Sequence, residues 1–261
     1  MKFELSNDYS LVRVLEITHY SNRLFSFKTL RPSKFKYNAG EFVMIGLIIN
    51  GEFVFRAYSI CTPSWSNELE FYSIKVLNGP FTTYLQKITT KSSIILKMKS
   101  TGTLIIKGLK PGKRLFLLCT GTGVAPFISV IFEPATYENF NEIVIVHTCR
   151  YVNELKYLNN KLKQLSRTIS LKSIIKNKVK FYTSVTRENY PYIGRITTLI
   201  KTGILISDLK TTNLNREDRF MICGSQNMIT DIMNLLKTLG YKEGSINLPQ
   251  DFVYEKSFVT K

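Results

Sequence analysis

The sequence is poor in the residues that most protein metal sites need. Its 261 residues include only two His and four Cys, and the Cys are too widely spaced to form a C-x-x-C pair. This spacing argues against zinc ribbons and conventional iron–sulfur ligand runs. No apolar stretch approaches the roughly 18 residues of a membrane span, and the first residues lack the apolar core of a signal peptide. We therefore expect no metal, no membrane insertion and a reducing, cytoplasmic location.

Acidic side chains are also scarce, with 19 Asp and Glu against 36 Lys and Arg, for a net charge of +17. Such an excess can attract nucleic acid, an anionic membrane or an acidic protein. One stretch, between Glu154 and Glu188, has nine basic residues and no acidic one, which leaves open a basic face that binds nucleic acid or a membrane surface. A generally cationic surface is the simpler explanation, because the basic residues are spread over the whole chain.

The first part of the chain has the pattern of an all-β unit. Short runs rich in β-branched and aromatic residues, separated by turns, are typical of a barrel or sandwich; they cover residues 11–17, 24–30, 42–47, 53–60, 69–76 and 93–98. One helix interrupts them, with Pro80 in a plausible first position and Phe81, Leu85 and Ile88 at helical spacing.

After the turn-rich residues 107–112 the pattern changes to strands alternating with helices. Strands are expected at 115–119, 143–147, 178–184 and 219–223, and helices at 124–132, 155–165 and 228–239. This alternation predicts a parallel sheet covered on both faces. The predicted fold is a two-domain β plus α/β architecture: an antiparallel β-barrel (1–110), then a Rossmann-like α/β domain (111–261).

A glycine-rich turn, Cys119-Thr-Gly-Thr-Gly-Val-Ala-Pro126, connects a predicted strand to a predicted helix. Glycines allow close approach of a pyrophosphate, and a helix N-terminus favours anions. A tight structural turn is the alternative, because Pro126 replaces the last Gly of the usual fingerprint. A similar junction at Ile222–Gln226 predicts a second wall of the same site, although Cys223 could be only a buried thiol.

Arginines follow two of the predicted parallel strands. Arg150 stands where an NAD-selective site usually has Asp or Glu. Arg187, beside Thr186, and Arg195 follow the next strand. Guanidinium groups suit a 2′-phosphate, so this pattern favours NADP over NAD.

In the predicted barrel, Arg56-Ala57-Tyr58-Ser59 combines a charge, an aromatic ring and a hydroxyl. A flat cofactor carrying a diphosphate uses all three, although an ordinary edge strand is the alternative. The predicted helix start at Pro80–Thr83 offers an anion site in the same domain. Together these features favour a flavin dinucleotide.

Taken in order, these motifs resemble the ferredoxin/flavodoxin-NADP reductases, specifically the bacterial subclass, over essentially the whole chain. The resemblance is carried by Arg56–Ser59, Phe71–Val76, Gly79–Thr82, Thr120–Phe127, His147–Arg150, Gly194-Arg195, Cys223–Ser225 and Val253–Val259. It implies an enzyme, an FAD-dependent oxidoreductase that passes electrons between NADP(H) and ferredoxin or flavodoxin through hydride transfer to flavin N5.

The resemblance also implies roles for individual residues. The FAD-binding set would be Arg56, Ala57, Tyr58, Ser59, Tyr72, Ser73, Ile74, Lys75, Val76, Gly79, Pro80, Phe81, Thr82, Thr120, Ser257 and Phe258. The NADP-binding set would be Thr120, Gly121, Thr122, Gly123, Val124, Ala125, Pro126, Arg150, Thr186, Arg187, Arg195, Cys223, Gly224 and Ser225. Ser59, Cys223 and Glu255 would orient and polarise the reacting groups, and the tail from Glu255 to Phe258 would cover the flavin.

The sequence departs from the subclass in its tail, where Ser257 replaces the usual Ala and the chain ends at Lys261. A reductase of the same fold that acts directly on quinones or ferric complexes remains an alternative. We expect a monomer that binds no nucleic acid, and we interpret its positive charge as steering an acidic ferredoxin or flavodoxin.

Overall fold

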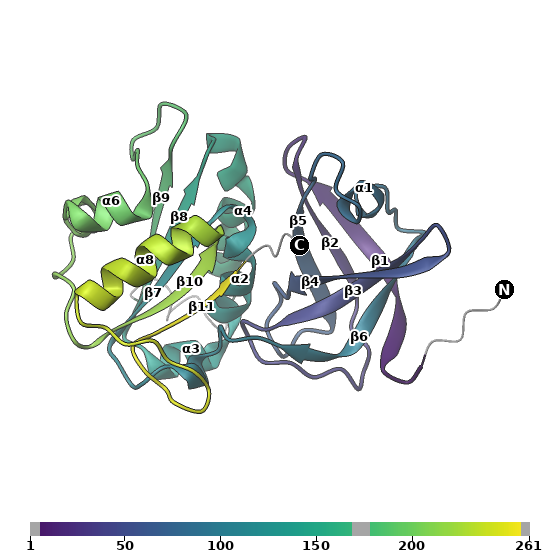
Figure 1. Cartoon of the computed structure of the whole chain (residues 1–261), viewed down its shortest axis with the longest axis horizontal. Helices are drawn as coiled ribbons and strands as arrows, with labels where there is room; N and C mark the ends of the chain where they lie inside the picture. Colours follow the sequence, from purple (N-terminus) through teal and green to yellow (C-terminus); the bar gives the residue numbers. More distant parts are fainter. Residues whose placement is uncertain (1–5, 169–177, 257–261) are drawn as a thin grey trace.

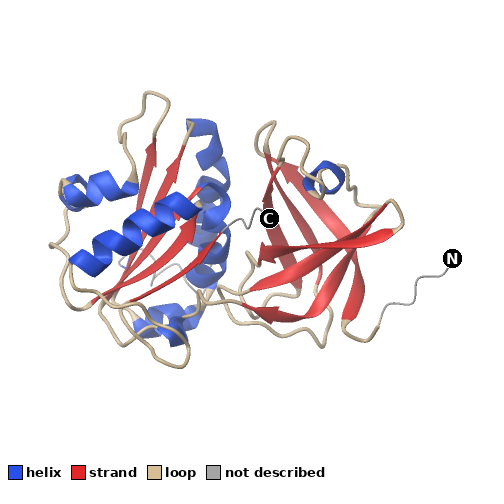
Figure 2. Ribbon diagram, viewed as in Figure 1, coloured by secondary structure: helices blue, strands red, loops and turns tan. Residues whose placement is uncertain are grey.

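A computed structural model describes residues 6–168 and 178–256 of the chain. Figure 1 shows two units side by side, the first containing an antiparallel sheet and the second a parallel one. Figure 2 shows that most helices belong to the second unit, on both faces of its sheet. The predicted β plus α/β architecture is therefore confirmed.

The first unit is a closed antiparallel barrel. Its strands are β1 (Tyr9–His19), β2 (Leu24–Leu30), β3 (Phe42–Ile49), β4 (Glu52–Ser59), β5 (Glu68–Ile74) and β6 (Ser93–Thr101), in the order β4-β3-β6-β1-β2-β5. The two outer strands meet just after β4, where Ile60 bridges to Phe71 and the Cys61 N–H donates to the Glu70 carbonyl at 2.8 Å. All six predicted strands are present, and buried aromatic residues such as Phe25 fill the barrel.

The helix predicted in this unit is shorter than expected. Only one turn, α1 (Thr82–Leu85), is helical, with buried Phe81 as its N-cap residue. The helical spacing continues to Ile88, which packs against the barrel core without belonging to the helix.

The second unit is a five-stranded parallel sheet in the order β11-β10-β7-β8-β9. Its strands are β7 (Arg114–Thr120), β8 (Glu142–Cys149), β9 (Val179–Val185), β10 (Asp218–Gly224) and β11 (Phe252–Lys256). The α-helices are α2 (Ala125–Phe132), α3 (Pro134–Asn139), α4 (Lys156–Arg167), α6 (Ile196–Lys201), α7 (Ile204–Asp208) and α8 (Gln226–Thr238), and the 3₁₀ turns are η1 (Ile106–Gly108), η2 (Gly121–Val124) and η3 (Val152–Leu155).

Sequence periodicity missed the short helices α3, α6 and α7. It also treated residues 253–259 as a tail, whereas the tail begins as the edge strand β11, paired with β10 from Phe252–Phe220 to Lys256–Gly224. A five-residue strand at the end of a chain carries too little pattern to be distinguished from a loop.

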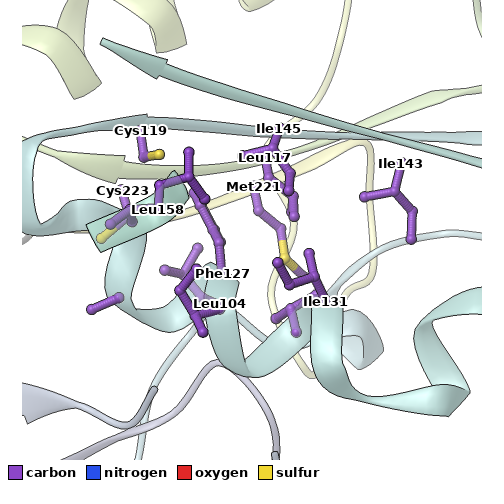
Figure 3. Close-up of a cluster of buried hydrophobic side chains, with 14 of the residues drawn as sticks. Leu104, Leu117, Cys119, Phe127, Ile131, Ile143, Ile145, Leu158, Met221 and Cys223 are labelled. Atoms are coloured by element: carbon purple, nitrogen blue, oxygen red, sulfur yellow. The ribbon is translucent and has the colours of Figure 1, made fainter. Parts of the chain in front are cut away.

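Helix α2 lies between the parallel sheet and the barrel. All eight of its residues are buried, as expected for a helix that is apolar all round. Figure 3 shows Phe127 and Ile131 of α2 close to Leu117, Ile145 and Met221 of the sheet. Leu24, Cys61 and Tyr72 of the barrel belong to the same hydrophobic cluster, so the two units share one core.

A polar and aromatic contact completes this interface. Tyr72 of β5 stacks on Tyr157 of α4, with ring centroids 3.9 Å apart and planes within 8°. Tyr20 meets both rings edge-on. One turn along α4, the buried ammonium of Lys161 pairs with the buried carboxylate of Glu70. These contacts fix α4 against the barrel.

Within the described ranges, 6–168 and 178–256, no helix is both long and apolar enough to cross a membrane. The same residues contain no group of three or more His, Cys, Asp and Glu side chains placed to bind a metal ion.

The buried pair predicts an asymmetric response to mutation. Lys161→Met should lower the free energy of unfolding by about 3–5 kcal/mol, because it leaves the Glu70 carboxylate buried without a partner. The double variant Glu70→Leu/Lys161→Met should recover most of that loss. Urea unfolding of the FAD-loaded protein measures both, with Lys28→Met, which breaks a partly exposed pair with Glu16, as a control costing less than about 1 kcal/mol. Equal losses in all three variants would contradict the assignment.

Candidate active site

The two glycine-containing junctions predicted from the sequence interlock at the carboxyl edge of the parallel sheet. A Cβ on Gly123 would lie 2.3 Å from the carbonyl oxygen of Cys223, and a Cβ on Gly224 would lie 2.3 Å from Thr120 Oγ1. Thr120 Oγ1 also accepts the Ser225 N–H at 3.3 Å. Only glycine permits this approach, so β7 and β10 end in one continuous wall.

Gly121 has a different role in the same wall. Its φ of 54° is in the left-handed region, and a Cβ built on it would meet nothing within 4 Å. The backbone of Gly121 therefore faces open space. This is the arrangement that lets a phosphate approach main-chain N–H groups next to the start of α2.

A buried imidazole holds the Gly121 turn in place. His147 Nε2 lies 2.9 Å from the Gly121 carbonyl oxygen. Because a carbonyl accepts, Nε2 carries the proton. Burial lowers the pKa of His147 to about 4, so the ring is neutral near pH 7 and acts as a structural donor.

The arginines predicted to bind a 2′-phosphate lie around the ends of β8 and β9. The Arg187 N–H donates to the Arg150 carbonyl at 3.0 Å, so the two loops run together. The Glu154 carboxylate stabilises the turn after β8 by accepting the Arg150 N–H at 2.9 Å. Arg195 is the N-cap residue of α6. All three arginines are exposed.

These loops and the interlocked junctions line one cavity of about 560 Å³. The predicted residues that line it are Thr120, Gly121, Thr122, Arg150, Thr186, Arg187, Arg195 and Ser225 from the NADP set and Thr120 and Ile74 from the FAD set. Val124, Ala125, Pro126 and Cys223 are instead buried behind the wall. Thr148 and Cys149, from the motif His147–Arg150, also line the cavity. The lining residues that the sequence did not single out are Arg23, Glu154, Ile196, Thr197, Asn227, Met228 and Asp231. Arg23 carries no sequence signal because it lies far from the other lining residues along the chain.

On the barrel side, Tyr58 is held by a hydroxyl pair. Its OH lies 3.0 Å from Ser73 Oγ, and its ring packs near Phe81 with centroids 6.1 Å apart. Burial raises the pKa of Tyr58 to about 12, so the phenol stays protonated. Tyr58 is still partly exposed as a residue, and Arg56, two residues before it, is exposed. The cluster predicted on β4 thus presents a ring and a guanidinium to the surface.

The turn after β5 is organised by side-chain to backbone bonds. Thr82 Oγ1 accepts the Val76 N–H at 3.2 Å, and a Cβ on Gly79 would lie 2.5 Å from the same oxygen. The predicted anion site at a helix N-terminus is not supported here, because α1 has a single turn and little dipole. The groups that could still bind an anion here are the main-chain N–H groups of the 76–82 turn, which includes Pro80 and directly follows Lys75.

Tyr72 of β5 takes part in the contact between the two units. Successive strand residues point to opposite faces, and Ser73 points toward Tyr58. Tyr72 consequently points to the outer face, where it stacks on Tyr157 and is only 4% exposed. The side chain of Tyr72 is therefore part of the interface between the units, on the same face of β5 as the cavity-lining Ile74. The expectation that it completes an FAD site stays a prediction.

Cys223 and Glu255 are neighbours in register on β10 and β11, so their side chains leave the same face of the sheet. The Glu255 carboxylate accepts the Thr103 N–H at 3.1 Å in the connection between the units. Burial, with a contribution from Glu41, raises the pKa of Glu255 to about 7. Ser59 ends β4 on the barrel. Ser257 and Phe258 lie outside the described residues.

The residues present fit the two expected dinucleotides. The open backbone at Gly121 and the cationic cavity suit a phosphorylated coenzyme, and the Tyr58 ring with Arg56 suits a flavin carrying a diphosphate. Ile74 of β5 and Thr120 of β7 line the same cavity from opposite units, so the cavity is bounded by both units.

Comparison with known proteins agrees with this division. An oxidoreductase FAD-binding domain family model matches residues 9–106, and an oxidoreductase NAD-binding domain model matches residues 117–234. A flavodoxin/ferredoxin–NADP reductase of Rhodobacter capsulatus is 45% identical over 94% of this chain and 92% of its own length. A ferredoxin–NADP reductase of Azotobacter vinelandii is 40% identical over 98% of this chain and all of its own.

A solved structure agrees at the level of the whole chain. The crystal structure of a ferredoxin NADP+ reductase from Neisseria gonorrhoeae with bound FAD and NADP is 28% identical, with a TM-score of 0.88 over 97% of this chain and all of that one.

Glu255 predicts a pH-dependent stability. The unfolded chain ionises near the ordinary value of 4.5, whereas the folded pKa is about 7. Folding therefore favours the protonated form, and Glu255 costs stability increasingly as the pH rises from 4.5 through 7. Glu255→Gln should remove this cost, with a gain over wild type about 1–3 kcal/mol larger at pH 8 than at pH 4.5. Urea unfolding across this range tests it, with exposed Glu52→Gln as a control; parallel profiles for wild type and Glu255→Gln would refute the assignment.

Proposed function

The chain belongs to the flavodoxin/ferredoxin–NADP reductase family, and from this we propose that it passes electrons between NADP(H) and ferredoxin or flavodoxin by means of bound FAD. The observation that carries the proposal is the near full-length 45% identity to the Rhodobacter capsulatus reductase. The cavity between the barrel and the parallel sheet supports it independently, because its lining is cationic and includes the open backbone of Gly121.

We assign the flavin to the barrel, residues 1–110. Tyr58, oriented by Ser73 and Phe81, offers a ring for stacking, Arg56 offers a charge for the diphosphate, and the 76–82 turn offers backbone groups. When bound, FAD supplies the conversion between the two-electron chemistry of NADPH and the one-electron chemistry of the carrier.

We assign NADP(H) to residues 111–261. The Gly121 turn would hold the pyrophosphate, and Arg150, Arg187 and Arg195 would bind the 2′-phosphate. Ser59, Cys223 and Glu255 would orient and polarise the reacting groups of the flavin and the nicotinamide. None of the three would act as a nucleophile. The neutral His147 supports this site from behind through the Gly121 carbonyl.

We propose an acidic carrier, a monomeric enzyme and a reducing compartment. The net charge of +17 supports the first, since opposite charge accelerates association. All four cysteines are buried thiols outside any disulfide, which is usual for proteins of reducing compartments.

An absorbance spectrum tests the central assignment. Purified protein loaded with FAD should show flavin bands that anaerobic NADPH bleaches rapidly and NADH bleaches slowly, because only NADPH carries the 2′-phosphate that the arginines would bind. Stopped-flow absorbance measures both rates. A protein that binds no FAD, or one that NADPH leaves oxidised, would overturn the proposal.

Carrier association should depend on salt. Raising the ionic strength from 0.01 to 0.15 M shortens the screening length from about 30 to about 8 Å. The second-order rate constant with an acidic ferredoxin or flavodoxin should therefore fall about tenfold or more. Turnover with an uncharged quinone serves as the control and should change little. A carrier rate constant independent of salt would exclude electrostatic steering.

A further inference from the structure

The coenzyme cavity has a wall that belongs to the barrel. Almost all of its lining residues come from the parallel-sheet unit; only Arg23 and Ile74 come from the first unit. Arg23 lies in the turn between β1 and β2, more than 100 residues before the nearest of the other lining arginines. The fold alone therefore brings it to this cavity.

The backbone around Arg23 is fixed on several sides. Its carbonyl accepts the Lys75 N–H at 2.7 Å, and its own N–H donates to Ser21 Oγ at 3.2 Å. The Tyr20 N–H donates across the turn to the Leu24 carbonyl at 2.9 Å. These bonds fix the main chain of the turn, and so the point at which the Arg23 side chain begins.

Tyr20 also fixes this turn against the coenzyme loops. Its ring lies edge-on to Tyr157, with centroids 5.3 Å apart. Tyr157 follows Glu154 by one turn of chain, and Glu154 accepts the Arg150 N–H. The contact between the units thus places the Arg23 turn beside the loop that carries Arg150.

Positive charges outnumber negative charges in the cavity. Four guanidiniums, those of Arg23, Arg150, Arg187 and Arg195, line it against two carboxylates. One of these, Glu154, already accepts backbone N–H groups. In the part of the chain that the structure describes, none of the four arginines has an ion-pair partner within 4.0 Å. An excess of positive charge without direct ion-pair partners favours a polyanionic ligand.

We propose that Arg23 binds a phosphate group of NADP(H) from the barrel side, so that the coenzyme is held by both units at once. The proposal rests on the proposed function and adds a residue to its site. Arginine suits this role because its planar, permanently charged fork makes paired hydrogen bonds to phosphate oxygens. A coenzyme bound to residues of both units would also stabilise the contact between the barrel and the parallel-sheet unit.

Equilibrium binding tests the proposal without turnover. Calorimetric titration of the FAD-loaded protein with NADP+ and with NAD+ at low salt gives the two dissociation constants. Arg23→Gln should raise the constant for NADP+ at least fivefold, and Arg23→Lys, which keeps the charge but loses the fork, should raise it less. Arg13→Gln, an exposed arginine of β1 outside the cavity, is the matched control and should change it less than twofold.

The pattern of loss identifies the phosphate. A loss confined to NADP+ places Arg23 at the 2′-phosphate, and an equal loss for NAD+ places it at the pyrophosphate. An Arg23→Gln protein that binds NADP+ as tightly as the Arg13→Gln control overturns the proposal, and so does one that loses FAD but binds NADP+ normally once reloaded. Arg150→Gln is measured in parallel: unchanged NADP+ affinity in that variant would count against the proposed coenzyme site itself, whatever Arg23 does.

Discussion

The burial of one helix layer between two sheets is the constraint on which the rest of the structure depends. Helix α2 has no polar face, and each of its larger side chains gains about 1.5–3 kcal/mol from burial. The parallel sheet covers one side of α2, and residues of the barrel pack into the same hydrophobic core. The orientation of the two units is thereby coupled to the stability of the second. The stack of Tyr72 on Tyr157 and the pair of Glu70 with Lys161 then fix that orientation at α4.

The site follows from this coupling, because its parts come from elements that the shared core holds in place. The end of β7 carries the open Gly121 turn directly into α2, and the end of β8 leads through Arg150 into α4. Both helices are packed against the barrel. Any residue on the adjoining face of the barrel is therefore placed relative to the coenzyme loops with the precision of a packed core.

The arginines of the cavity repel one another, and a bound anion would relieve this repulsion. Four arginines converge on the cavity, and His147 beside it stays neutral because burial lowers its pKa to about 4. The positive potential therefore comes from groups whose charge does not change near pH 7. We therefore expect the affinity of the proposed site for a phosphorylated coenzyme to depend on salt more than on the charge state of these protein groups near pH 7.

The sequence by itself determined the two kinds of sheet, the ten longer strands and the glycine turn after β7, because each of these depends on local periodicity or on the backbone freedom of glycine. It also determined that Arg150, Arg187 and Arg195 follow strand ends. It could not determine that α1 stops after one turn or that residues 252–256 form an edge strand, since both outcomes depend on packing partners distant in the chain. Tyr72 and Arg23 show the same limit most clearly. The stack of Tyr72 on Tyr157 was not expected from the sequence, and Arg23 gave no signal although it lines the coenzyme cavity. Only the tertiary structure decides which residues from separate units meet.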